Sequence, residues 1–405
     1  MALPNWLPPL AAVVLMQVVG AFQFQAIWVL GPVLTAAAGV APERIGELSG
    51  LISLGSAWFF LSGTPILQRM GSLRTLQLGA LLGSASLLIF FFPWWPVLML
   101  ASLIIGFGYG PTTPAASDVL ARYTPARHKS AMFSIKQAGA PLGGAIAGIL
   151  LPSLAAFAGW QSAMVATALL GVVTLIVVQG VRRELDADRD VTVALSIRAV
   201  LSPANLAQPF RAVAMTPRLP LLTVASFCLA AIQGNLFTFA VTYLTDEVGL
   251  SLVQAGAASS AMLVAGMIGR VAMGWTADRL GSAILVIRTL AVTATLAMLG
   301  VAAVGRDWPY PLIIAVFTCA GFFATTWNGV FLAEVARIAP KGQIGTATAG
   351  SAFITFIAYF SGPFIFGKTV SAVGTYGPVF AGLAVLGLVA AAALVLAGRR
   401  PESLD

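Results

Sequence analysis

The chain of 405 residues is too apolar and too poor in charge for an ordinary soluble protein, because 59% of its residues are hydrophobic and only 9% are charged. An average soluble protein carries about 25% charged residues. Its two cysteines lie in apolar segments, it has one histidine, and it lacks a phosphate-binding loop. These features argue against a disulfide framework, a metal site, an enzyme active site and ATP-driven transport, and no cofactor is expected.

Twelve apolar stretches follow one another along the chain. Each is close to the roughly 20 residues that a helix needs to cross the hydrocarbon of a membrane. The alternating pattern of a membrane barrel is absent, so all twelve are predicted to be helices. They cover residues 7–34, 47–67, 73–92, 97–121, 130–154, 160–181, 219–244, 252–277, 284–304, 310–336, 345–368 and 375–397.

The one long polar interruption falls in the middle of the chain and divides the predicted helices six and six. We therefore expect an N-terminal six-helix bundle over residues 1–181 and a cytoplasmic linker over 182–218. A C-terminal six-helix bundle over 219–398 and a cytoplasmic tail over 399–405 complete the predicted organisation.

The basic residues predict the orientation. When both termini are placed in the cytoplasm, 17 of the 22 Lys and Arg residues fall in cytoplasmic loops or the tail, three in external loops and two within helices. This asymmetry is the positive-inside bias of membrane proteins. It explains the net charge of +8 without nucleic acid, and predicts a multi-pass protein of the lipid bilayer, in a bacterial inner (cell) membrane.

The two halves of the chain repeat one another. A shift of 210 residues carries Ala21–Gln25 onto Ala231–Asn235, and Arg69–Ser72 onto Arg279–Ser282. Self-similarity over half a chain indicates a duplicated architecture. In membrane transporters such halves usually enclose a binding site near the midplane.

Two short motifs carry a family resemblance. Residues 274–281, Gly-Trp-Thr-Ala-Asp-Arg-Leu-Gly, resemble the cytoplasmic loop signature of the major facilitator superfamily. Residues 64–71 are a degraded copy in which Gln68 replaces the acidic residue, and residues 139–144 resemble a helix-5 motif of superfamily antiporters. The resemblance implies an all-α fold of twelve helices in two pseudo-symmetric six-helix bundles, and a monomeric secondary active transporter that works by alternating access.

The same resemblance implies gating roles for three residues. Asp278 would hold the cytoplasmic face of the second half closed, while Arg279 and Arg69 would contact neighbouring helix ends, whose carbonyl dipoles favour cations. Gln68 leaves the equivalent lock of the first half in doubt.

Lys136 and Arg270 are the two cations within helices. Such a charge costs about 2.5–3.5 kcal/mol on insertion scales, so it usually faces a partner or a watery cavity. Arg270 lies about 12 Å up its helix from Asp278, and Lys136 lies about 10 Å up its helix from Lys129. The resemblance places both helices at the interface between the halves, so both charges could face one anionic substrate. Alternatively, Lys136 pairs with Asp118 or extends toward the cytoplasm.

Four amides occupy repeat-equivalent positions in helices 1 and 7: Gln23, Gln25, Gln233 and Asn235. Residues two apart on a helix point about 200° apart, so only one of each pair can face the centre. They bind substrate or hold helices together. Because helices 1, 4, 7 and 10 line the cavity in the superfamily, the resemblance adds secondary candidates: Tyr109, Thr112, Thr113, Thr326, Trp327 and Asn328.

We therefore expect a carrier of a small organic anion, most simply a carboxylate. Glu334, near the end of helix 10, has two alternative roles: it pairs with Arg337, or it carries a proton that is transported together with the anion. One alternative is a proton-coupled efflux antiporter for hydrophobic drugs or metabolites. Another is a membrane receptor that transports nothing.

Overall fold

The protein is described here by a computed structural model, which covers residues 6–123, 129–193, 211, 213–214, 216–339 and 344–400. The chain forms two compact units. Unit 1 comprises Met1–Val40 and Leu51–Ser202, and unit 2 comprises Ala41–Gly50 and Pro203–Asp405. The start of one N-terminal helix thus belongs to the second unit.

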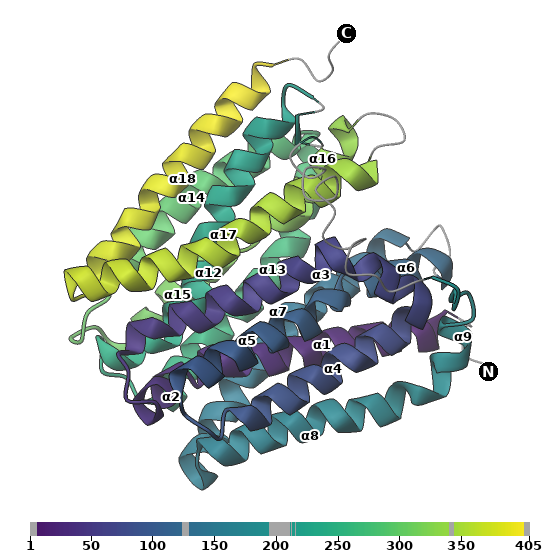
Figure 1. The fold of residues 1–405 in the computed structure, drawn as a ribbon. Coiled ribbons are helices and arrows are strands. Elements are labelled where there is room, and N and C mark those ends of the chain that lie inside the picture. Colours follow the sequence, from purple (N-terminus) through teal and green to yellow (C-terminus); the bar gives the residue numbers. More distant parts are fainter. Residues whose placement is uncertain are drawn as a thin grey trace. The chain divides into compact units, whose positions relative to one another are not determined.

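The regular elements in the described part of the first half are all helices. Its elements are α1 (Leu7–Val29), α2 (Gly31–Ala37), η1 (Pro42–Arg44), α3 (Ile45–Met70), α4 (Ser72–Ile89), α5 (Trp95–Tyr109), η2 (Gly110–Thr112), α6 (Pro114–Tyr123), α7 (Lys129–Ala158), α8 (Trp160–Val178), η4 (Gln179–Val181) and α9 (Arg182–Leu185). In unit 1, α1 packs against α7 and α8, and α4 packs against α5 and α8 (Figure 1).

The second half contains α12 (Leu219–Asp246), α13 (Leu252–Leu280), α14 (Ala283–Ala302), α15 (Tyr310–Ala324), α16 (Trp327–Ile338), α17 (Ile344–Val373) and α18 (Gly377–Gly398). In unit 2, α12 packs against α17 and α18, and α13 packs against α15. Local sequence sets the ends of α13: Ser251 and Gln254 form a capping box at its start, and Gly281 ends it in the left-handed conformation.

Two predicted helices are interrupted, one in each half. The stretch predicted over 97–121 is α5, η2 and α6, and the stretch predicted over 310–336 is α15 and α16. In the first half Pro111 and Pro114 lack the N–H that a continuous helix needs. In the second half Thr325, with φ −120° and ψ 4°, leaves the helical conformation. These breaks lie at repeat-equivalent places, so the duplication extends to local backbone geometry.

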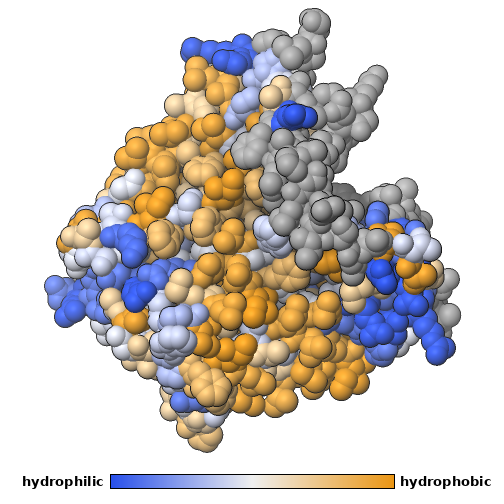
Figure 2. All heavy atoms as spheres, viewed as in Figure 1, coloured by the Kyte–Doolittle hydropathy of each residue, from blue (hydrophilic) through white to orange (hydrophobic). Residues whose placement is uncertain are grey.

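Among the described residues, eleven helical stretches are long and apolar enough to cross a membrane. The twelfth predicted span, 47–67, lies in α3, a helix of 26 residues. Apolar side chains cover the flanks of the helices, and hydrophilic residues gather at their ends (Figure 2). Exposed residues such as Phe157, Ile176 and Phe92 would be costly in water and are favourable in lipid.

Candidate functional site

Lys136 lies on α7 in unit 1 and is only 1% exposed. Its Nζ donates a hydrogen bond of 3.1 Å to Oε1 of the adjacent Gln137. Within the described ranges no carboxylate pairs with it: Asp118, one predicted partner, instead forms an ion pair of 2.7 Å with Arg122. The alternative that Asp118 neutralises Lys136 is therefore wrong, and the depth of burial argues against extension to water.

Gln17 on α1 is a polar residue that the sequence did not single out. Its Nε2 donates a hydrogen bond of 2.9 Å to the hydroxyl of Tyr109. The side chain lies against Gly139, where an added methyl group would come within 3.1 Å of Gln17 Cγ. Gly139 is three residues from Lys136, so both face the same side of α7. Position 227, the repeat equivalent of Gln17, is a phenylalanine, so comparison of the halves gave no signal there.

The predicted amides of helix 1 make different contacts. Gln23 Nε2 donates to Ser84 Oγ at 2.8 Å and to the Ala80 carbonyl at 3.3 Å. Ser84 in turn donates to the Ala168 carbonyl at 3.0 Å, so Gln23 helps to join α1, α4 and α8. These are the contacts of a residue that holds helices together. Gln25 is 3% exposed, and its Nε2 has no partner among the described residues.

In unit 2, polar residues meet at the break between α15 and α16. Arg270 Nε on α13 donates to the Thr325 carbonyl at 3.3 Å. Three residues further, Asn328 Nδ2 donates to Gln233 Oε1 of α12 at 3.0 Å. Asn235 instead donates to the Ala231 carbonyl of its own helix at 2.8 Å. Contacts at and beside the break thus involve Arg270, Asn328 and Gln233, while Asn235 bonds within its own helix.

Other candidates on these helices are packed into the protein. Trp327 is 0% exposed and its ring lies 5.8 Å from that of Phe331. Tyr109, besides its bond from Gln17, stacks on Phe24 at 4.8 Å. Glu334 is 2% exposed and accepts hydrogen bonds of 2.8 and 2.7 Å from Arg337.

The predicted gating residues divide between the two units. In unit 2, Asp278 is exposed near the end of α13, and the guanidinium of Arg279 lies 4.5 Å from the centre of the Trp275 ring. In unit 1, Arg69 Nη1 donates to the Val193 carbonyl at 3.0 Å. Arg69 was expected to contact the end of a neighbouring helix, but it contacts Val193 of the predicted linker instead.

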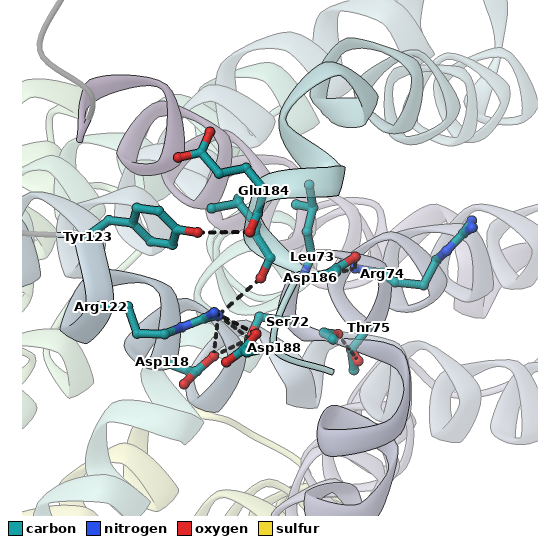
Figure 3. Close-up of polar contacts among 12 residues, drawn as sticks. Ser72, Leu73, Arg74, Thr75, Asp118, Arg122, Tyr123, Glu184, Asp186 and Asp188 are labelled. Atoms are coloured by element: carbon teal, nitrogen blue, oxygen red, sulfur yellow. Dashed lines mark hydrogen bonds and ion pairs between the residues drawn. The ribbon is translucent and has the colours of Figure 1, made fainter. Parts of the chain in front are cut away.

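That contact belongs to a docked segment, residues 182–193, which we call the linker strap. Asp186 accepts hydrogen bonds from the backbone N–H groups of Leu73 at 2.8 Å and Arg74 at 3.2 Å. Arg122 binds Asp188 at 2.6 Å, as Figure 3 shows. Burial raises the pKa of Asp186, although these N–H groups oppose the shift. The first third of the predicted linker is thus fixed to unit 1. Residues 194–210 of that linker and 401–405 of the predicted tail lie outside the described residues.

The start of α3 is anchored within unit 2. Glu47 accepts two hydrogen bonds of 2.9 Å from Arg44 and lies 3.8 Å from Lys368 Nζ of α17. The hydroxyls of Ser49 and Thr238 are 2.6 Å apart. Neither Glu47 nor Ser49 was predicted, because Lys368 and Thr238, which tie them to other helices of unit 2, lie far along the chain.

Comparison with known proteins agrees with this architecture. The family model of the Major Facilitator Superfamily matches residues 13–363 and 222–405. The hexuronate transporter of Bacillus subtilis is 22% identical, over 95% of this chain and 93% of that protein. The probable nitrate/nitrite transporter NarK2 of Mycobacterium tuberculosis is 31% identical, over 46% of this chain and 47% of that protein.

Among solved structures, a bacterial homolog of the human lysosomal transporter Spinster, inward-facing and unoccupied, aligns with a TM-score of 0.77. The alignment covers 98% of both chains at 15% identity, so it speaks for the fold alone. The predicted all-α fold is confirmed. The chain belongs to the major facilitator superfamily, and it is a multi-pass membrane transporter rather than an enzyme.

Proposed function

We propose that this transporter carries a small organic anion, most simply a carboxylate, by alternating access. The observation that supports this best is Lys136, an ammonium group 1% exposed with only an amide as its described partner. A buried charge without a counter-ion is costly, because it has lost its water. An anion that binds beside Lys136 removes this cost, so the site favours a negatively charged substrate.

Arg270 is the second proposed contact. Its guanidinium is planar and suits the two oxygens of a carboxylate. The bond from Nε to the Thr325 carbonyl holds the side chain at the start of α16, where the positive end of the helix dipole also favours an anion. Asn328 and Gln233 lie at the same break and offer further hydrogen bonds.

The names of two relatives support an anion: one is a hexuronate transporter, and the other is a probable nitrate/nitrite transporter. The efflux alternative has less support. Export of a cation with exchange of protons needs a deep carboxylate that is free to titrate. Its candidates, Asp118 and Glu334, are each paired with an arginine at 2.7 Å.

Uptake into proteoliposomes tests the proposal, with radiolabelled benzoate, propionate, lactate, 4-hydroxybenzoate, glucuronate and nitrate as the panel. Loss of a hydrogen bond to a charged group weakens binding about 10- to 100-fold. We expect Lys136→Gln and Arg270→Gln each to lower the apparent affinity for the transported anions by at least about tenfold. Arg183→Gln, which removes an exposed arginine of the linker strap, is the matched control and should leave uptake unchanged.

Two results would contradict the proposal. If both site variants fold and carry the anions like the wild type, neither residue binds an anion. If the wild type moves no member of the panel and none of them shifts its melting temperature, the receptor alternative gains support.

A further inference from the structure

Gln17 has an acceptor that the folded chain leaves unused. The residue is 3% exposed, and its Oε1 has no hydrogen-bond partner among the described residues. An amide oxygen can accept two hydrogen bonds. Because this oxygen has lost its water on burial, a donor that reaches it is bound favourably.

The amide is held in place from its other end. Nε2 donates to the Tyr109 hydroxyl at 2.9 Å, which anchors the group between α1 and α5. A terminal amide is flat, so fixing its nitrogen also fixes the direction of its oxygen. Gln17 is therefore a preorganised acceptor rather than a freely rotating side chain.

The position of Gln17 relates this acceptor to the proposed anion site. A methyl group added to Gly139 would lie 3.1 Å from Gln17 Cγ, so the two residues are in close contact. Gly139 follows Lys136 by three residues, close to one helical turn. One turn of α7 thus carries a buried cation and packs against the side-chain carbons of Gln17.

We propose that Gln17 Oε1 accepts a hydrogen bond from a hydroxyl group of the substrate, so that the substrate class is a hydroxylated carboxylate. This inference rests on the proposed function, since the carboxylate itself is received by Lys136 and Arg270. An anion without a hydroxyl satisfies the cation but leaves the acceptor unpaired. Sites that hydrogen-bond a substrate hydroxyl reject the analogue lacking it, by up to about 10⁴–10⁵-fold.

Matched pairs of anions test this. Lactate is compared with propionate, and 4-hydroxybenzoate with benzoate, by competition for uptake into proteoliposomes. The wild type should prefer the hydroxylated member of at least one pair by about tenfold or more. Gln17→Met keeps the length of the side chain and removes the acceptor, so that preference should fall to within about twofold of unity.

Gln77→Met is the matched control. Gln77 is also buried, its Oε1 also lacks a described partner, and its Nε2 bonds with Leu175 and Gln179 on the α8 side of unit 1. Its replacement should leave the preference unchanged. Tyr109→Phe, which releases the amide, should reduce the preference and serves as the second variant if Gln17→Met does not fold.

The outcomes separate the two proposals. Equal affinities within both pairs in the wild type, or a preference that persists in Gln17→Met and Tyr109→Phe, would overturn the role of Gln17 while the dependence on Lys136 still supports anion transport. A wild type whose anion uptake does not depend on Lys136 or Arg270 would overturn the proposed function itself.

Discussion

The carboxylate of Asp186 accepts the backbone N–H of Leu73 at 2.8 Å, although 113 residues separate the two along the chain. Leu73 is in the first turn of α4, where backbone N–H groups have no partner within the helix. The residue before the helix is Gly71, which has no side chain to cap it and has φ +89°. Asp186 therefore supplies both the missing cap and a negative charge that the helix dipole favours.

Asp186→Ala should destabilise unit 1. The change removes a buried group that accepts from two N–H donors, and we expect it to lower the free energy of unfolding by about 1–3 kcal/mol. Thermal unfolding of the purified protein in detergent measures this. Asp190→Ala is the control, because Asp190 is exposed and, among the described residues, its side chain accepts hydrogen bonds only from nearby Thr192. Equal melting temperatures for both variants would rule out the capping role.

The same residue should give stability a specific dependence on pH. Burial raises the pKa of Asp186 above the ordinary 3.8, so the folded state holds the proton more tightly than the unfolded state. The part of its contribution that depends on proton binding is complete below pH 3.8 and is lost as the pH rises through the raised value, while the hydrogen bonds to Leu73 and Arg74 remain. The melting temperature of the wild type should therefore fall relative to Asp186→Asn across this window. A constant difference between them from pH 4 to 7 would contradict this assignment.

Arg122 joins α6 to the linker strap, and lysine should not replace it. Its guanidinium binds Asp118 at 2.7 Å, Asp188 at 2.6 Å and the Leu185 carbonyl at 3.1 Å (Figure 3). A lysine ammonium is a single point and cannot make this planar set of contacts. Because the side chain is 27% exposed, we expect Arg122→Lys to cost only about 1 kcal/mol. The clearer readout is trypsin cleavage at Arg189, which should become faster as the linker strap loosens. Cleavage at the wild-type rate would show that Arg122 does not hold the strap.

Features that depend on local sequence were predictable. The apolar runs predicted the helices, and the repeat predicted that corresponding elements recur in each half. The break at Thr325 was missed, because the stretch 310–336 is mainly apolar and contains no proline near that point. Backbone geometry there depends on contacts such as the bond from Arg270.

Prediction of the candidate site from the sequence was limited mainly by side-chain partners that lie far apart along the chain. Lys136 was identified because a charge in an apolar helix is visible in the sequence, but whether Asp118 neutralised it was not. Asp118 does not neutralise Lys136 because it is paired with Arg122, which lies one helical turn away. Gln17 gave no signal, because one amide in an apolar helix is ordinary and its acceptor becomes significant only beside Tyr109 and Gly139.

Two glycine-to-alanine substitutions should have opposite effects. In a helix, alanine is normally favoured over glycine by about 0.5–1 kcal/mol. At Gly382, within α18, an added methyl group meets nothing within 4 Å, so Gly382→Ala should raise the melting temperature slightly. At Gly46, in the first turn of α3, the methyl group would overlap the Pro363 carbonyl oxygen and lie 2.8 Å from the Phe239 ring.

A backbone carbonyl cannot move aside as a flexible side chain can, so Gly46→Ala must displace the start of α3 from α17. Overpacking of this kind costs about 1–3 kcal/mol, which exceeds the gain in helix propensity. The displacement should also separate Ser49 from Thr238. The Ser49→Cys variant places a thiol at this buried position. That thiol should react faster with a soluble maleimide when Gly46→Ala is added, and at an unchanged rate when Gly382→Ala is added. Melting temperatures that shift in the same direction for both glycine variants would show that the contact between Gly46 and Pro363 does not hold α3 in place.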